Sequence, residues 1–480
     1  MFKEKKTLLA AIFFLGFFLL VYFDSFGNFF SQDDFYHLAL SRLNKPLDVF
    51  NFFNPIFQKD VHFRPLGTQV FFSIAHVFSQ TLAPLILRLV AFGFHLANFY
   101  LVFHLLKKFL KKEFLAMVLA GVYLIAPLHF MSIYYISAFQ QILAAFWQLA
   151  GFWFFALGKK RYVYLCFVLA LLSKETAIVF PVLLLIFSYT IRLPKNLTVC
   201  LGRLKKEFSY WWPFLFLLIT YGLVRLVMPQ HDPGVNYQLS LSPRTLISSW
   251  RWYLVWLIGA PETITRYAGR VFDFNLISFL KDSGSWGRIF LVVFLAEIAL
   301  LCLVIALGLK KKRTSAKLLR LLAYLGLFGP FFIASLLPVS FFPYHRYAHY
   351  LDLNLFYLLL VGGIVFLKLK MPKILWVLLL TLFLANTYSS VAVDKKLHWT
   401  TARSQIAREY FWAFQEEDLC RQEGVYFINT PILSAHEANI ALFNHWGPAY
   451  FCRYQSMPPV YYQGLNPPSE KDQFKIVRIK

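Results

Sequence analysis

Two adjacent carboxylates, Asp33 and Asp34, follow the first apolar segment of the chain, which spans about residues 8–23. Charged side chains beside a membrane span are costly if they face lipid, and useful if they face a cavity at the membrane surface. A carboxylate there can take a proton from an acceptor or hold a cation beside a lipid-linked substrate. A solvated acidic turn is the alternative, but the rest of the chain favours the chemical interpretation.

The composition is that of a membrane protein. The chain has 480 residues, of which 59% are hydrophobic and only 15% are charged, whereas a soluble domain has about a quarter charged. Its net charge of +24 comes from short basic runs between apolar segments. Such runs mark cytoplasmic loops. A nucleic-acid site would need a basic face with interleaved aromatic residues, and the sequence shows none, so we expect no nucleic-acid partner. The runs are 3–6, 107–112, 159–161, 203–206, 310–313 and 368–373.

The apolar segments predict an all-α polytopic membrane protein with about eleven crossings and a cytoplasmic N-terminus. A full crossing needs roughly 20 apolar residues, and the parity of the basic loops resolves two segments that break this rule. We interpret 161–191 as two short helices meeting at Lys174, and 245–260 as a helix lying at the outer interface. The expected spans are about 7–23, 84–106, 113–129, 134–157, 161–172, 175–191, 208–228, 288–309, 316–338, 350–367 and 373–391.

This count places the remaining charged and polar features on one side of the membrane. The outer loop 24–83 with its acidic pair, the tip at Lys174, the loop at 343–346 and the tail after about 391 all face outward. Within the outer loop, residues 66–79 are apolar on one side and are expected to lie on the membrane. The sequence therefore predicts a transmembrane catalytic domain, 1–391, and a small extracytoplasmic α/β domain, 392–480.

The tail predicts a small soluble module. Residues 425–429 and 475–479 are typical of strands, and 402–420 of an amphipathic helix. Cys420 and Cys452 fall in this tail and can pair in an oxidising compartment, but spacing alone does not decide it. The first span follows a basic run and lacks a cleavage site, so it is expected to be a retained anchor.

Motifs of soluble enzymes are absent. The chain has no glycine-rich phosphate loop, no G-x-S-x-G, no Cys-x-x-Cys and no H-E-x-x-H. An enzyme on the outer face has no nucleotide supply, so its donor would arrive in the membrane, for instance as a sugar on a polyprenyl phosphate. That chemistry needs a base for the acceptor hydroxyl and cations for the leaving phosphate. It also needs an apolar groove and aromatic faces. Asp33 or Asp34 can be the base.

Three cations, Arg64, Lys174 and Arg346, can reach a phosphate at the outer headgroup level. The alternative for each is headgroup snorkelling or an ordinary ion pair, and Lys174 and Glu175 can simply satisfy one another. The histidines of the apolar segments fit helix-packing contacts better than metal ligation. They are His95, His104 and His129.

Six short stretches recur in a recognisable order: Asp33-Asp34, 63–66, 93–98 with His104, 126–129, 172–178, and 337–340 followed by Arg346-Tyr347. Together they resemble the GT-C membrane glycosyltransferases. The nearest likeness is to the membrane half of the protein O-mannosyltransferase-like group, which includes the tetratricopeptide-containing transmembrane O-mannosyltransferases. The resemblance covers about residues 1–370. Residues 134–141 depart from it where relatives carry an arginine and an acid, and no tetratricopeptide repeats follow.

The resemblance implies an inverting transfer of a sugar from a polyprenyl-phosphate donor to a glycan, lipid or protein acceptor outside a bacterial inner membrane. Asp33 matches the acidic residue proposed as the base, and Asp34 beside it would orient the acceptor or bind a cation. The sequence does not decide whether a divalent cation binds, because no third oxygen ligand is identifiable. The expected substrate-binding residues are His37, Arg64, His129, Lys174, Glu175, Arg346 and Tyr347, of which the cations would hold the donor phosphate.

Two other functions compete with this one. A transporter or flippase of a lipid-linked sugar would need charged residues at the membrane midplane and usually repeat symmetry. A non-catalytic binding scaffold of the same fold is the third possibility. The gathering of acids and bases at one face favours the enzyme.

Overall fold

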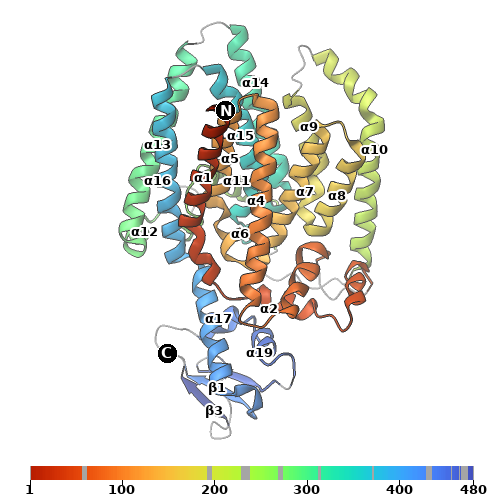
Figure 1. The fold of residues 1–480 in the computed structure, drawn as a ribbon, viewed down its shortest axis with the longest axis vertical. Coiled ribbons are helices and arrows are strands. Elements are labelled where there is room, and N and C mark those ends of the chain that lie inside the picture. The colour runs from red at the N-terminus through yellow and green to blue at the C-terminus, as the bar shows by residue number, and fades with distance from the viewer. Residues whose placement is uncertain are drawn as a thin grey trace.

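The apolar segments form long helices that run side by side, and the polar tail folds against one end of this bundle (Figure 1). The computed structural model is 79% helical. It describes residues 2–56, 62–191, 197–228, 238–268, 274–311, 315–369, 372–428, 435–455, 457–463, 465 and 474–478. For residues 2, 3, 197–210, 308–311 and 315–322 it describes the helical backbone alone.

The helices of the bundle, in chain order, are α1 (Phe2–Tyr22), α2 (Asp33–Leu40), α3 (Phe71–Ser73), α4 (Ala83–Leu110), α5 (Glu113–Ile125), α6 (Phe130–Tyr134), α7 (Phe139–Ala156), α8 (Lys160–Ser173), α9 (Phe180–Ile191), α10 (Leu197–Val227), α11 (Pro243–Leu257), α12 (Leu276–Ser283), α13 (Ser285–Lys311), α14 (Ser315–Ser340), α15 (Asp352–Leu369) and α16 (Lys373–Leu397). Short helical turns connect them: η1 (Phe23–Gly27), η2 (Pro46–Phe53), η3 (Leu66–Val70), η4 (Ile74–Val77), η5 (Pro127–His129), η6 (Ile136–Ala138), η7 (Glu175–Val179), η9 (Glu262–Tyr267) and η10 (Ala348–Leu351).

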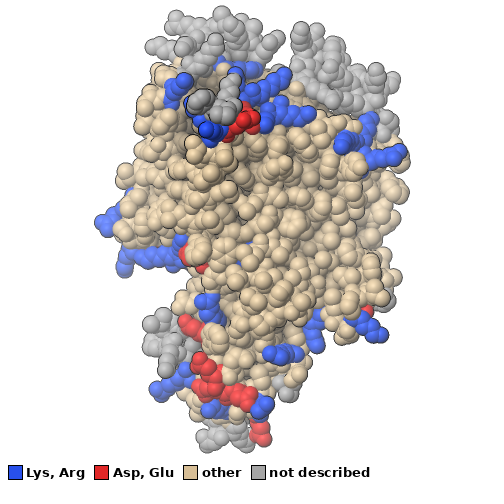
Figure 2. All heavy atoms as spheres, viewed as in Figure 1, with Lys and Arg blue, Asp and Glu red and all other residues tan. Residues whose placement is uncertain are grey.

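The long helices make the chain an integral membrane protein. Among the described residues, six helices are long and apolar enough to cross a membrane, and α5 with η5–α6, bent by 43°, adds a seventh if counted as one span. Only 11% of the Ser285–Leu307 segment is buried in the protein. An apolar surface of that extent faces lipid rather than water. Figure 2 shows the corresponding broad band without charges, below an end where Lys and Arg gather.

The sequence predicted about eleven spans, and among the described residues helix length and composition support six or seven. Part of the difference arises where helices are short or interrupted, and α10 is described with side chains only from Trp211 onward. α8 has 14 residues and α9 has 12, whereas a crossing needs roughly 20. The predicted span 134–157 is divided by η6 before α7 begins. The other spans, the membrane orientation and the GT-C arrangement stay predictions. Residues 312–313 and 370–371 of the basic runs lie outside the described residues.

Two local predictions can be compared directly with the structure. α8 ends at Ser173, Lys174 is extended, and η7 begins at Glu175, as expected for two short helices that meet there. A helix also forms within 245–260, namely α11. Its aromatic residues turn inward, with Trp252, Tyr253 and Trp256 buried in the main core, because the face that packs on α14 and η10 is the aromatic one. Its place at an interface stays a prediction.

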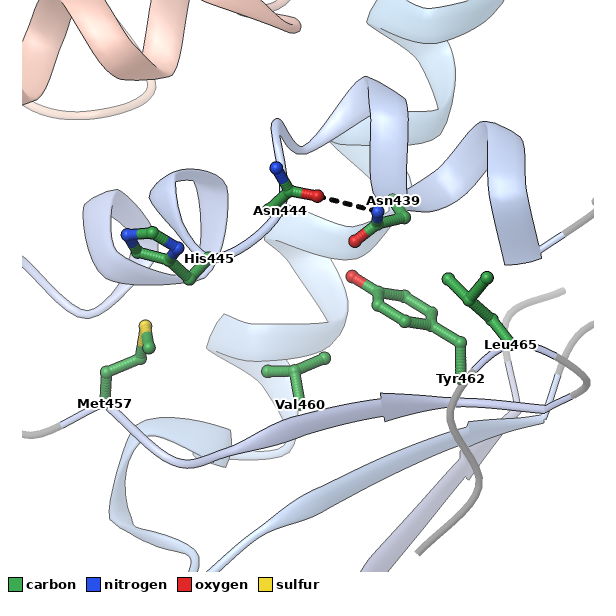
Figure 3. Close-up of a pocket in the computed structure, with 7 residues that line it drawn as sticks. All are labelled: Asn439, Asn444, His445, Met457, Val460, Tyr462 and Leu465. Carbon is green, nitrogen blue, oxygen red and sulfur yellow. Dashed lines mark hydrogen bonds between the residues drawn. The ribbon is translucent and has the colours of Figure 1, made fainter. Parts of the chain in front are cut away.

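The tail folds into a small α/β module. It contains α17 (Trp399–Glu416), η11 (Leu419–Arg421), β1 (Val425–Ile428), α18 (Ala435–Ala441), α19 (Trp446–Phe451), β2 (Val460–Tyr462) and β3 (Lys475–Arg478). The predicted helix and both predicted strands are present, while residues 429 and 479 lie outside the described residues. β2 was not predicted. The strands are parallel in the order β2-β1-β3, and α18 and α19 lie between β1 and β2 in the chain. A pocket opens beside β2 (Figure 3).

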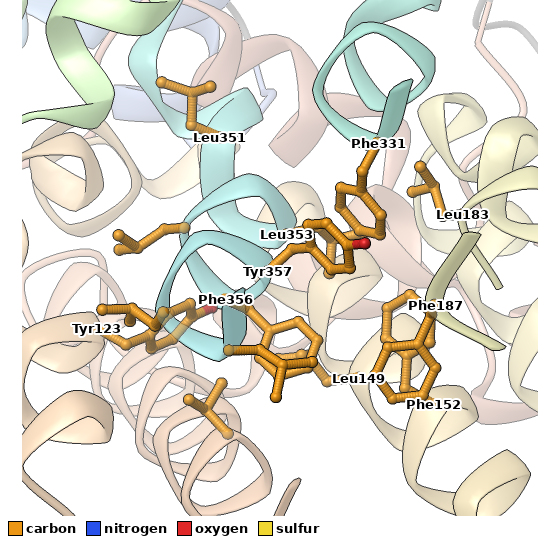
Figure 4. Close-up of a cluster of buried hydrophobic side chains, with 14 of the residues drawn as sticks. Tyr123, Leu149, Phe152, Leu183, Phe187, Phe331, Leu351, Leu353, Phe356 and Tyr357 are labelled. Atoms are coloured by element: carbon orange, nitrogen blue, oxygen red, sulfur yellow. The ribbon is translucent and has the colours of Figure 1, made fainter. Parts of the chain in front are cut away.

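The largest core lies between α4, α5, α7, α9, α14 and α15 and is dominated by aromatic rings (Figure 4). Phe331 and Tyr357 stack with ring centroids 3.9 Å apart, and Phe152 lies 4.7 Å from Phe187. Offset and edge-on ring pairs add directional packing to hydrophobic burial. This core fixes α15 against α7 and α9. It therefore also fixes the relative positions of the polar residues at the ends of these helices.

A second core joins the C-terminal module to the helix that carries the two acids. Phe29, Phe30 and Phe35 pack with Phe411, Tyr450 and Phe451 of the module. Backbone contacts reinforce this docking: Ser404 Oγ accepts from Phe29 N–H at 2.7 Å, and Ala441 O accepts from Gln32 N–H at 2.8 Å. The module therefore covers the end of the bundle at α2. α16 continues past residue 391 and ends at Leu397, next to the start of α17.

A disulfide between Cys420 and Cys452 ties η11 to the end of α19. Serine at both positions is expected to destabilise the module by about 2–4 kcal/mol, since cross-links restrict the unfolded chain. Limited proteolysis of the full-length protein in detergent measures this as faster cleavage within the tail. Cys302→Ser, at an exposed free cysteine of α13, is the control and should change nothing. Equal protection of the double variant and the wild type would contradict the expectation.

Candidate functional site

The start of α2 is fixed by Asp34, whose carboxylate is buried. Oδ1 accepts from the N–H and the hydroxyl of Ser137, at 2.8 and 2.5 Å, and Oδ2 accepts from Ser31 N–H at 2.9 Å. Acidic side chains in the first turn also suit the helix dipole. Asp34 thereby clamps α2 to the loop that begins α7. Three hydrogen bonds hold the Asp34 side chain in this clamp, and a catalytic role for Asp34 stays a prediction.

Asp33, by contrast, presents its side chain to solvent. Enough protein surrounds it that burial raises the pKa of Asp33, while the Tyr135 hydroxyl and the charges of Arg64 and Arg403 lower it. A carboxylate that is both accessible and partly desolvated is typical of a recess. Asp33 N–H donates to the Tyr135 hydroxyl at 3.1 Å. The carboxylate is thus held at the bundle end with two arginines within electrostatic reach.

Arg64 is buried, and its guanidinium is held on two sides. Nε donates to Glu175 Oε2 at 2.5 Å, Nη2 pairs with Glu175 Oε1, and Nη1 donates to Gln140 Oε1 at 2.5 Å. The fork of an arginine matches a carboxylate in this bidentate way, which lysine cannot do. Residues 111 positions apart in the sequence therefore meet, and they connect the outer loop to the break between α8 and η7.

Gly67 explains how the outer loop comes so close to that break. A Cβ at this position would lie 2.2 Å from Ser173 O and 2.8 Å from Gln140 Cβ. Pro65, which starts the turn, favours helical entry because it needs no N–H partner at that point. Any side chain at residue 67 would push the turn away from Ser173 and Gln140 and so pull Arg64 from Glu175.

Lys174 lies beside this ion pair in the extended residue between α8 and η7. It is 4% exposed, and its Nζ lies 4.6 Å from the centre of the Tyr350 ring, a favourable cation–π distance. The Asp352 carboxylate at the start of α15 is close enough for its charge to act on Lys174.

In the loop between α14 and η10, His345 lies nearest to these charges, and substrate binding by Arg346 and Tyr347 stays a prediction. Burial lowers the pKa of His345 to about 3, with contributions from the Lys174 and Arg64 charges. The neighbouring Arg346 points to α11, where Nη1 lies 3.5 Å from Ser248 Oγ. His345 instead lies near Arg64, Lys174 and Glu175, which together form the ion cluster of this site. Tyr347 packs beside Tyr135 and Met131.

The other predicted substrate-binding residues lie deeper. His37 is buried on α2 with its ring 5.3 Å from that of Phe72. His129 is 1% exposed, with Nδ1 2.9 Å from Asp352 Oδ1 and Nε2 donating to Tyr123 O at 2.8 Å. His95 packs against it, with ring centroids 4.6 Å apart. These histidines make interior contacts in this structure, and substrate binding by His37 and His129 stays a prediction.

Sequence reasoning missed several residues at this site: Tyr135, Ser137, Gln140, His345 and Arg403. Three of them lie in the stretch 134–141, which attracted attention only because it departs from the family pattern. Arg403 comes from α17 of the C-terminal module, where Nε donates to Glu437 Oε2 at 2.8 Å. Its place in an amphipathic helix gave no signal that it would act on Asp33.

The described residues contain no group of three or more His, Cys, Asp or Glu side chains arranged to hold a metal ion. A divalent cation at Asp33 and Asp34 stays a prediction. Comparison of the chain with protein-family models, with curated proteins and with solved structures found no match.

Proposed function

We propose that this membrane protein is an inverting glycosyltransferase. It moves a sugar from a polyprenyl-phosphate donor to an acceptor hydroxyl at the end of the bundle covered by the C-terminal module. One observation carries the proposal: the accessible carboxylate of Asp33 lies within electrostatic reach of Arg64, which is paired to Glu175 next to Lys174. A carboxylate that can act as the base and cations that can bind phosphate, at the same end of an apolar bundle, support this reaction.

In the proposed reaction, Asp33 takes the proton of the acceptor hydroxyl as its oxygen attacks the anomeric carbon of the sugar. The bond from that carbon to the phosphate oxygen breaks, and polyprenyl phosphate leaves with the electron pair. Lys174 and Arg64 stabilise the charge that develops on the phosphate. A single displacement inverts the anomeric carbon, so one carboxylate suffices where a retaining mechanism needs two.

Aromatic side chains near Asp33 suit a sugar ring. The Tyr135 ring lies 5.0 Å from that of Trp399, and Tyr347 packs on the same cluster. Such faces can stack on the C–H groups of a pyranose. The disulfide of the module agrees with an oxidising compartment on this side, which is where a polyprenyl-linked donor would serve an enzyme without nucleotides.

The test is to offer the purified protein a panel of polyprenyl-phosphate sugars and to measure the polyprenyl phosphate released from each. We expect release with at least one donor, and a product of inverted anomeric configuration by NMR. If the protein moves donors across vesicle membranes without releasing lipid phosphate, it is a transporter. Binding with neither transport nor release would make it a scaffold.

The pH dependence of transfer is expected to report the protonation of Asp33. A base works only when deprotonated, so kcat/KM should rise with pH as Asp33 loses its proton. Burial raises the pKa of Asp33 above the ordinary 3.8, which places this rise at higher pH than for an exposed aspartate. Tyr135→Phe keeps the ring but removes the hydroxyl that lowers the pKa. The rise should therefore move to still higher pH in this variant.

Asp34 needs a control, because burial raises its pKa to about 7. In Asp34→Asn the rate is expected to fall, but the rise with pH should persist, since it belongs to Asp33. The pH dependence would belong to a group other than Asp33 if the rise of kcat/KM with pH disappeared in Asp34→Asn. The same would follow if Tyr135→Phe left the pH of that rise unchanged.

A further inference from the structure

The C-terminal module carries a pocket that the proposed transfer step does not use. It has a volume of about 470 Å³ and lies between α18, the turn after it, and β2 (Figure 3). Pockets of a few hundred Å³ are typical of small-molecule sites. Its lining includes Asn439, Asn444, His445, Met457, Val460 and Tyr462.

The chemistry of this lining is neutral and mixed. Two amides, an imidazole and a phenol provide both donors and acceptors of hydrogen bonds, and aliphatic and thioether side chains supply apolar walls. Among the described residues that line the pocket, none is Lys, Arg, Asp or Glu. A polyol with apolar C–H faces would match both kinds of surface.

The polar groups of the pocket are held in place before any ligand arrives. Phe443 and Asn444 adopt left-handed backbone conformations, with φ of 51° and 57°, which asparagine tolerates better than most residues. This turn brings Asn444 back to Asn439: Asn444 N–H donates to Asn439 O at 2.9 Å, and Asn439 Nδ2 donates to Asn444 Oδ1 at 2.7 Å. Such preorganisation lowers the entropic cost of binding.

The residues that line the pocket are more exposed at its rim than at its floor. Asn444 and His445 are exposed at the rim, while Tyr462 is 3% exposed at the floor. In Figure 3 the hydroxyl of Tyr462 and the amide oxygen of Asn439 both point into the space between β2 and α18. A ligand can therefore enter past the amide pair and reach the phenol.

The same turn touches the helix that carries Asp33. The Tyr36 ring of α2 lies 5.9 Å from that of Phe443 and 5.7 Å from that of Trp446. Gln32 N–H donates to Ala441 O just before the turn. The pocket and the start of α2 therefore share one junction, and a chain bound in the pocket would be attached to a surface that adjoins the candidate base.

We propose that this pocket binds a neutral saccharide and holds the acceptor of the transfer reaction as a glycan chain. That the saccharide is an acceptor rests on the proposed glycosyl transfer. Binding of the saccharide itself depends only on the pocket.

Binding is tested on the full-length protein in detergent by saturation-transfer NMR. The probes are methyl glycosides of glucose, mannose, galactose and N-acetylglucosamine, with their disaccharides, and glucuronic acid and glucosamine as charged comparators. We expect a neutral probe to bind, and Asn439→Ala to weaken it on the order of tenfold, the effect of one lost hydrogen bond. Asn44→Ala, at an exposed asparagine of the outer loop, is the matched control and should bind as the wild type does.

A second variant distinguishes loss of the pocket from misfolding of Asn439→Ala. Met457→Trp, which fills the pocket, should also abolish binding while the tail keeps its resistance to protease. The proposal is overturned if no neutral probe binds, if Asn439→Ala and Met457→Trp bind as the wild type does, or if a charged comparator or a Ser/Thr-rich peptide binds in their place.

The same variants separate the two proposals. Saccharide binding by the wild-type protein, without consumption of any donor, leaves the pocket assignment intact and removes the transferase. Donor consumption with an unchanged KM for the acceptor in Asn439→Ala leaves the transferase intact and removes the pocket from its substrate path.

Discussion

Replacement of Asp33 by asparagine is expected to lower the rate of sugar transfer by about 10²–10⁴-fold, the usual contribution of a positioned general base. Asparagine has nearly the same shape, but it cannot accept the proton of the acceptor hydroxyl. Because the Asp33 side chain is accessible, the fold should tolerate the change. Release of polyprenyl phosphate from the donor, measured beside donor binding, separates chemistry from affinity.

The matched control is Asp48→Asn. Asp48 lies in the same outer loop, and its Oδ2 accepts from Asn44 N–H and Lys45 N–H at 3.1 and 2.8 Å, away from the ion cluster. This variant should transfer at the wild-type rate. If Asp33→Asn loses donor binding together with transfer, or retains full transfer, then Asp33 is not the base.

Replacement of Arg64 by methionine is expected to cause the largest loss of stability among single changes at the site. Removal of one partner from a buried ion pair costs about 3–5 kcal/mol, because the other charge is left without compensation. The Arg64 side chain is 7% exposed and that of Glu175 is 36% exposed, so water can reach Glu175 and the cost should fall near the lower limit. Thermal unfolding in detergent, followed by tryptophan fluorescence, measures it as a lower midpoint.

The chain offers an exposed ion pair for comparison. Lys107 and Glu113 lie 2.6 Å apart with side chains 44% and 40% exposed, and exposed pairs contribute about 0–1 kcal/mol. Lys107→Met should therefore barely move the midpoint, and Arg64→Met with Glu175→Met should recover part of the loss. Similar shifts for Arg64→Met and Lys107→Met would show that the buried pair does not hold the loop to the break.

The sequence predicted those features that depend on local pattern. Helical apolar segments and the break at Lys174 follow from periodicity and from the cost of charge in lipid. The number of full spans was harder to predict, because hydropathy does not decide whether 161–191 forms full crossings or short helices. Parity of basic loops needs an even number of crossings there, but it does not specify their length.

The partners of the site residues could not be predicted, because they come from distant segments. Asp34 meets Ser137 across 103 positions, and Arg64 meets Glu175 across 111. Packing of whole helices decides such contacts, and no local pattern encodes them. Cys420 and Cys452 show the same limit: spacing permitted a disulfide, and only the fold of the module brings their Cα atoms to 5.4 Å.

The most direct measurement is an electron cryomicroscopy structure of the protein with the polyprenyl-phosphate sugar that it consumes, using Asp33→Asn to prevent turnover. We expect the donor phosphate to contact Lys174 or Arg64, with the anomeric carbon facing residue 33 and the lipid tail along the apolar bundle. A donor headgroup bound at the opposite end of the bundle, or one whose anomeric carbon lies away from residue 33, would contradict the account.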